Sequence, residues 1–357
     1  MSEPVSPSSS ASRARFGRGR LLRVAGAFGV LLAVACYMAV QYLSGGGGPP
    51  RCVAHAGDEP DGGGPTYEMT PEQAANAATI SAVGTRRGLP ERAVTIALAT
   101  ALQESALRNL DHGDRDSLGL FQQRPSKGWG TAAQIQDPVY SAGEFYDHLV
   151  EVPGYSRLPL TEAAQRVQRS GFPQAYAKHE PDAALLAAAL TGRSAASLTC
   201  STPTGITPGR PEKVRAALTR DFGTEVTAAD TAHEVSVPVS AAGGTAGGER
   251  GASVAGDASE AGETGEAGGS DGTGGTDTSG GTGRSAAGST ASQRGWELAH
   301  WAVAQSWELR IDEVAYAGRV WRAGQAHRGW QRVEGTGGGR TDGPDSGAEV
   351  VRITTAR

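Results

Sequence analysis

The residues best suited to chemistry in this chain lie between positions 101 and 130. An alanine-rich apolar stretch predicts a helix that carries one acid, Glu104, near its C-terminal end. A polar segment follows at 108–117, and then the apolar–amide run 119–122 (GLFQ). A carboxyl group next to apolar side chains has a raised pKa and can hold a proton near neutral pH. The predicted apolar wall is Leu107, Leu120 and Phe121.

Two short strings in this stretch resemble a known enzyme family. The pair 104–105 (ES) followed by 117–122 (SLGLFQ) resembles the signature of the lysozyme-like soluble lytic transglycosylase superfamily, a Glu-Ser at a helix end and then a Gly-Leu-Met-Gln turn. The longer string 116–126 with 128–130 (GWG) resembles its actinobacterial branch, and the N-terminal span described below would make this a membrane-anchored member. The resemblance covers about residues 70–199 and implies an all-α lysozyme-like catalytic domain over 67–200.

The resemblance also implies a role for each matching residue. Glu104 would be the catalytic acid that protonates the glycosidic oxygen between N-acetylmuramic acid and N-acetylglucosamine in peptidoglycan glycan strands. Tyr176 stands where the family has Ala-Tyr-Asn-Ala-Gly, although the Asn is absent from this chain. No cofactor and no metal are expected. The predicted substrate-binding residues are Ser105, Asp116, Gly119, Leu120, Phe121, Gln122 and Tyr176.

The loop after Glu104 offers candidates for a second acid. Most glycosidases use two carboxylates, whereas the resemblance to lytic transglycosylases implies that one suffices. The candidates are Asp111, Asp114 and Asp116, of which Asp116 is closest to the GLFQ run; loop turns and helix caps are the alternative roles. A calcium loop is excluded, because Leu118 and Pro125 occupy positions that would have to supply ligands.

The N-terminal segment predicts a membrane anchor. Residues 1–23 carry five arginines and one acid, and 24–43 form an apolar run. Twenty helical residues reach roughly 30 Å, enough to cross a bilayer. The arginines predict a cytoplasmic tail at 1–23, a single-pass transmembrane signal anchor at 24–43 and an extracytoplasmic remainder at the cell membrane. A cleaved signal peptide and lipidation at Cys36 are the alternatives.

The cysteines fit that extracytoplasmic prediction. Cys36 lies in the span, while Cys52 and Cys200 bracket the predicted catalytic domain. Thiols outside the membrane oxidise, so a Cys52–Cys200 disulfide is predicted, with two free thiols as the alternative. Closing a loop of about 150 residues stabilises by about 4–5 kcal/mol in the chain-entropy model.

Helix signals fill the predicted catalytic domain. Thr70, Pro71 and Gln73 form a capping box with proline at the first helical position, which predicts a helix that stops at Gly88. Further helices are expected at 90–107, 138–150, 161–170 and 181–190.

Two linkers and a small terminal module complete the predicted organisation. Residues 44–66 and the Gly/Ala/Thr-rich segment 201–294 are expected to be linkers, the second long and disordered apart from a helix near 210–222. Residues 295–357 predict a small α+β module with a helix at 296–310. Its strands are expected at 314–316, 320–321 and 350–354. Its tryptophans are interpreted as core, with a platform for sugar rings as the alternative: Trp296, Trp301, Trp307, Trp321 and Trp330.

Composition limits the possible partners. The net charge of −5 is spread along the chain and gives no sign of nucleic-acid binding. The resemblance implies peptidoglycan glycan strands as a partner, and the apolar run 24–43 predicts the cytoplasmic membrane as the other. The predicted function is a membrane-tethered enzyme, a lytic transglycosylase or muramidase, that cleaves glycan strands. The alternative is a non-catalytic wall-binding or scaffold protein.

Overall fold

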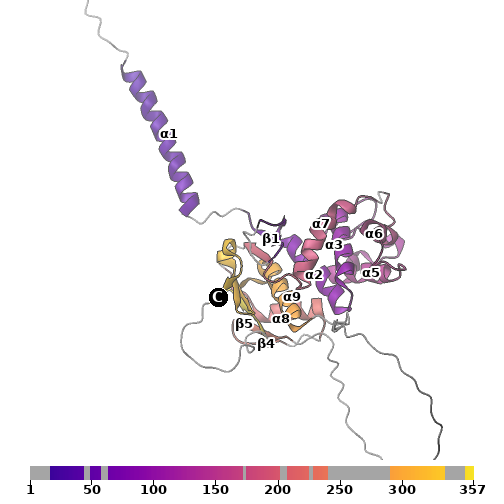
Figure 1. The fold of residues 1–357 in the computed structure, drawn as a ribbon. Helices are drawn as coiled ribbons and strands as arrows, with labels where there is room; N and C mark the ends of the chain where they lie inside the picture. The colour runs from indigo at the N-terminus through magenta and orange to yellow at the C-terminus, as the bar shows by residue number, and fades with distance from the viewer. Residues whose placement is uncertain are drawn as a thin grey trace, which may run out of the picture. The chain divides into compact units, whose positions relative to one another are not determined.

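The computed structural model describes residues 17–43, 49–57, 63–171, 174–201, 207–224, 228–239, 290–333 and 350–357 (Figure 1). The chain divides into two compact units, Met1–Pro50 and Arg51–Arg357. The first unit contains helix α1 (Gly17–Leu43). The predicted span 24–43 falls in this helix, but no helix in the described part of the chain is long and apolar enough to cross a membrane. Residues 1–16 of the predicted basic tail lie outside the described residues.

The helices of the second unit follow the sequence signals closely. Helix α2 (Pro71–Arg86) begins with the predicted capping box, in which the Thr70 and Gln73 side chains each accept from the other's backbone N–H. Helix α3 spans Glu91–Ser105 and carries Glu104 in its last turn. The remaining helices before the second sheet are α4 (Ala132–Ile135), α5 (Pro138–Val150), α6 (Leu160–Gln168), α7 (Glu180–Leu190) and α8 (Pro211–Phe222).

Small residues allow these helices to pack closely. Helix α2 packs against α3 and α5, and α3 packs against α7. A Cβ on Gly84 of α2 would lie 2.7 Å from the hydroxyl oxygen of Tyr146 on α5, so only glycine fits at this contact. The Tyr146 hydroxyl donates to the carbonyl of Ile80 at 3.0 Å, which satisfies a buried polar group inside the interface.

A three-stranded antiparallel sheet shows that the predicted all-α fold is wrong. Strands β1 (Arg51–His55), β2 (Thr66–Met69) and β3 (Leu198–Ser201) pair in the order β2-β1-β3. β1 lies in the segment 44–66 that was predicted to be a linker. Strands of four or five residues carry little periodicity, and β1 pairs with β3 across nearly the whole domain, so no local pattern predicts the pairing.

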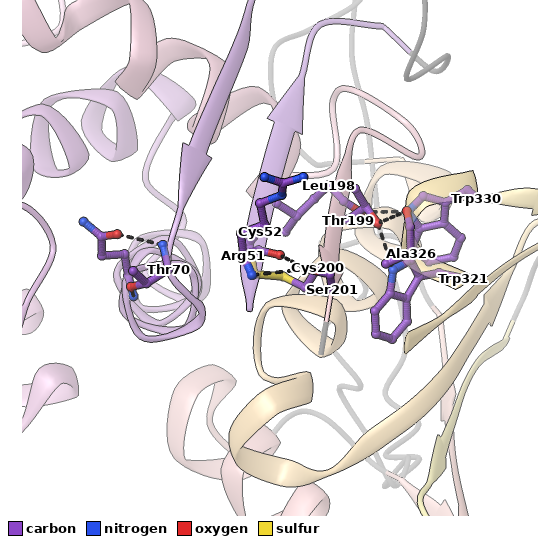
Figure 2. The surroundings of a disulfide bond; sticks show 11 residues. Arg51, Cys52, Thr70, Leu198, Thr199, Cys200, Ser201, Trp321, Ala326 and Trp330 are labelled. Carbon is purple, nitrogen blue, oxygen red and sulfur yellow. Dashed lines mark hydrogen bonds between the residues drawn. A yellow bond between two sulfur atoms is a disulfide. The ribbon is translucent and has the colours of Figure 1, made fainter. Parts of the chain in front are cut away.

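The predicted disulfide is confirmed in this sheet. Cys52 and Cys200 face each other in the β1–β3 register and are bonded, 148 residues apart in sequence (Figure 2). Cys36 is a free, exposed cysteine in the first unit. The bond therefore joins the two ends of the segment that holds Glu104.

A second sheet draws on a segment that was predicted to be unstructured. Its order is β4-β5-β9-β6-β7-β8 and all its pairs are antiparallel. β5 lies in the segment 201–294 that was predicted to be a disordered linker. It forms a strand there because it pairs with β9 and buries its alternate residues. Residues 240–289 of that predicted linker lie outside the described residues. The strands are β4 (Ala229–Asp230), β5 (Glu234–Pro238), β6 (Ile311–Tyr316), β7 (Arg319–Arg322), β8 (Gln331–Arg332) and β9 (Val350–Thr355).

The C-terminal segment packs directly onto the helices. Helices α9 (Ala291–Ala304) and α10 (Ser306–Leu309) replace the single predicted helix, and α9 contacts α2, α7 and β3. The indole N–H groups of Trp321 and Trp330 donate to the Thr199 hydroxyl and the Leu198 carbonyl of β3 (Figure 2). Four of the five C-terminal tryptophans are buried, as the core interpretation expected: Trp296, Trp301, Trp321 and Trp330.

A buried carboxylate joins three helices at this contact. The Asp221 side chain of α8 is fully buried. Its Oδ2 accepts from the Thr79 hydroxyl of α2 at 3.0 Å and from the Trp301 indole of α9 at 2.8 Å. Arg220 donates to its other oxygen at 2.7 Å. A buried carboxylate needs such partners, so the packing of α2, α8 and α9 depends on this group of hydrogen bonds.

Candidate functional site

Glu104 lies where helix α3 ends in an unusual turn. The two residues that follow the helix, Ala106 and Leu107, both adopt left-handed backbone conformations, with φ of 53° and 59°. Such conformations are uncommon for residues other than glycine and need support from their surroundings. Helix α2 supplies it, because the side-chain amides of Gln73 and Asn76 donate to the carbonyls of Ala106 and Leu107, each at 2.8 Å. The position of Glu104 therefore depends on α2 as well as on α3.

The carboxyl group of Glu104 is half-buried and has two hydrogen-bond partners. The Tyr176 hydroxyl donates to its Oε1 at 2.6 Å. The side chain of Gln168, at the end of α6, also hydrogen-bonds it. Burial raises the pKa of Glu104, and the two hydrogen bonds oppose that rise only in part. The result is a carboxyl group that keeps its proton to higher pH than an ordinary glutamate.

The GLFQ loop is attached to this helix end through its backbone. The Ser105 hydroxyl donates to the Leu120 carbonyl at 2.7 Å. The Gln168 amide donates to the Phe121 carbonyl at 2.7 Å, so one side chain contacts both the loop and the acid. The side chains of the predicted wall are fully buried, and Phe121 stacks on Phe145 with ring centroids 4.6 Å apart. Leu120 and Phe121 thus fix the loop from the core and expose no side-chain surface.

The other two residues of the loop have conformations that few residue types adopt. Gly119 has a φ of 75°, and a Cβ there would lie 2.7 Å from the Ile135 carbonyl oxygen. Gln122 has a φ of 48°, and its amide donates weakly to the carbonyls of His112 and Gly119 at 3.3 and 3.4 Å. Gln122 is partly exposed. The loop therefore presents one partly exposed amide on a fixed backbone.

Asp116 is held inside its own loop. One carboxylate oxygen accepts from the Arg124 guanidinium and the other from the Ser126 backbone N–H, each at 2.8 Å. These hydrogen bonds hold the pKa of Asp116 well below its ordinary value. Asp111 and Asp114 have side chains that are 89% and 90% exposed. For these three aspartates, a structural role in the loop fits this geometry better than a role as a second catalytic acid.

The structure brings together most of the predicted site and adds residues that sequence reasoning missed. Ser105 bonds the GLFQ loop directly and Tyr176 bonds Glu104, while Gln168 links the loop to the acid. Both oxygens of Asp116 bond within the segment 116–126. Gln168 has no sequence signature, because a glutamine near the end of an amphipathic helix is ordinary. Asn76 could have been found from the sequence, because it is a polar residue among the alanines that predict the buried face of α2. Within the described ranges, no group of three or more potential metal ligands occurs.

Two comparisons with known proteins find no relative. No family model matches the chain, and no curated protein matches it. Function is therefore inferred from the geometry of the site and from the motif at 104–130.

Proposed function

We propose that this protein cleaves the glycan strands of peptidoglycan, with Glu104 as the general acid, in the manner of a lytic transglycosylase. The observation that carries the proposal is the half-buried Glu104 carboxyl, which has a raised pKa and accepts a 2.6 Å hydrogen bond from Tyr176. A carboxyl group with a raised pKa keeps its proton to higher pH, which suits it to protonate a glycosidic oxygen. The resemblance of 104–105 and 116–130 to lytic transglycosylases indicates the substrate class.

Each neighbour of Glu104 has a defined part in the proposed reaction. Glu104 transfers its proton to the glycosidic oxygen as the bond to the anomeric carbon breaks. The carboxylate that remains is stabilised by hydrogen bonds from Tyr176 and Gln168. Ser105 and the turn at Ala106 and Leu107 hold the acid against the GLFQ loop.

The surroundings of the aspartates favour a mechanism with one carboxylate. Both oxygens of Asp116 already accept hydrogen bonds from its own loop, so it is poorly placed to activate water. The hydroxyl at C6 of the muramic acid would then attack its own anomeric carbon and return a proton to Glu104, leaving a 1,6-anhydro end. The Cys52–Cys200 disulfide supports an oxidising location outside the cytoplasm, where peptidoglycan lies.

The decisive experiment digests purified peptidoglycan with the full chain and with Glu104→Gln. The substitution keeps the size and hydrogen bonding of the side chain but removes the transferable proton. Activity should fall by about 10²–10⁴-fold, the usual contribution of general acid catalysis. Mass spectrometry of the products should show 1,6-anhydro ends.

Asp116→Asn is the matched control, because it neutralises the nearby loop acid and should retain most activity. Equal losses in both variants with native folds, together with reducing ends in the products, would instead show a two-carboxylate muramidase. Full activity in Glu104→Gln would disprove the role of Glu104. Binding without any cleavage by the wild-type chain would favour the non-catalytic alternative.

A further inference from the structure

Trp307 differs from the other tryptophans of the C-terminal segment. This residue is 38% exposed, whereas the other four tryptophans are at most 6% exposed. It lies in α10 and lines a pocket of about 440 Å³ between α10 and the start of α2. That volume is within the range of small-molecule sites, roughly 300–1,000 Å³. The indole therefore presents exposed ring surface to a pocket large enough for a small ligand.

Polar groups of both charges surround this indole. The pocket is lined by the carboxylates of Glu72 and Glu308, by the Asn76 amide and by Arg310. The Arg310 guanidinium lies over the Trp307 ring, 5.3 Å from its centroid, and so takes up part of one face of the indole. The lining thus offers hydrogen-bond acceptors, hydrogen-bond donors and one flat apolar surface, without a strong charge of one sign.

A saccharide has the surface that matches this lining. A pyranose ring has an apolar C–H face that packs on an indole and a rim of hydroxyl groups that both donate and accept hydrogen bonds. A peptide added as a strand would need a free sheet edge, but the pocket is formed by helices and the turn after α10. We propose that this pocket binds a saccharide, with one sugar ring packed on Trp307 and its hydroxyls bonded to the surrounding polar side chains.

This inference goes beyond the proposed function and does not depend on it. The pocket and the acid share one element, since Asn76 lines the pocket and donates to the Leu107 carbonyl three residues after Glu104. The pocket would bind a saccharide whether or not Glu104 cleaves one. The pocket adds a second glycan contact, formed jointly by the C-terminal segment and the start of α2.

The test measures binding of N-acetylchitotetraose to the full chain carrying Glu104→Gln, so that no bond is cleaved. Isothermal titration gives the Kd, and NMR follows the indole N–H signals of the tryptophans. We expect the sugar to shift the indole signal that is missing from the additional variant Trp307→Phe. Trp307→Ala should weaken the binding by about tenfold or more, which corresponds to 1.4 kcal/mol. Glu308→Ala should weaken it by about fivefold, as for the loss of one hydrogen bond.

The matched control is Val150→Ala, which removes an exposed apolar side chain from α5 and should leave the Kd unchanged. Absence of binding in the parent, an unmoved Trp307 signal, or an unchanged Kd in a folded Trp307→Ala chain would each overturn the proposal. If Trp307→Ala fails to fold, Glu308→Ala and the Trp307 signal of the parent decide the question. The outcome is separate from the activity of Glu104, which the peptidoglycan digest measures.

Discussion

Glu104 and Asp116 are two carboxyl groups twelve positions apart, and their surroundings drive their pKa values in opposite directions. Glu104 is half-buried, and burial raises its pKa. Asp116 is partly exposed and accepts hydrogen bonds from Arg124 and Ser126, which lower its pKa. One group is thus suited to donating a proton, while the other stays ionised and fixes a loop.

The two environments also differ in how they are assembled. The partners of Asp116 lie within ten residues of it in sequence. The surroundings of Glu104 come from α2, the GLFQ loop, the end of α6 and Tyr176, which the tertiary fold brings together. The acid of the proposed reaction therefore depends on the whole domain, whereas the loop acid depends only on its own turn.

The largest expected effect tests this dependence on the whole domain. Removing the disulfide with Cys52→Ala and Cys200→Ala should lower the free energy of unfolding by about 4–5 kcal/mol, because the closed loop spans 148 residues. Urea denaturation measures the change, and Cys36→Ala is the control because this cysteine is free and exposed. An unchanged stability in the double variant would mean that the β1–β3 pairing holds the domain without the bond.

An intermediate effect concerns the hydrogen bond from Tyr176 to Glu104. This bond favours the ionised carboxylate, so Tyr176→Phe should raise the pKa of Glu104 further. Because the reaction needs the protonated acid, the fall of activity at high pH should move to higher pH in this variant. A pH profile of peptidoglycan cleavage checks the shift. A move to lower pH would show that the hydrogen bond stabilises the protonated form instead.

The smallest expected effect concerns Asp116. Its lowered pKa means that the ionised side chain stabilises the folded chain above its unfolded pKa of about 3.9, and that this contribution is lost as the pH falls through the folded value. Asp116→Asn should therefore lower the Tm slightly at neutral pH, and the difference from wild type should shrink below about pH 4. Thermal melts at several pH values measure it. A Tm difference between the two chains that grows in acid would contradict a stabilising role for the ionised Asp116 side chain.

The local part of the structure could be predicted from the sequence. The capping box at Thr70 and Gln73, the helix that ends beside Glu104, and the strands near 314–316 and 350–354 each depend on neighbouring residues, and the structure contains them. The all-α prediction failed because β1 and β3 are short and pair across 148 residues. The linker prediction failed at β5 for the same reason, since its burial depends on β9, more than a hundred residues later.

The sequence by itself determined the positions of Glu104, Ser105 and the GLFQ run, because a helix end and a glycine-containing turn are encoded by adjacent residues. The pairing of Cys52 with Cys200 also followed from the sequence, since these are the two cysteines that bracket one domain. Only the tertiary structure decided that Gln168 and Tyr176 contact Glu104 and that Asp116 bonds within its own loop. Burial and long-range hydrogen bonds set the pKa of a carboxyl group, and both depend on residues that are distant in sequence and meet only in the folded chain.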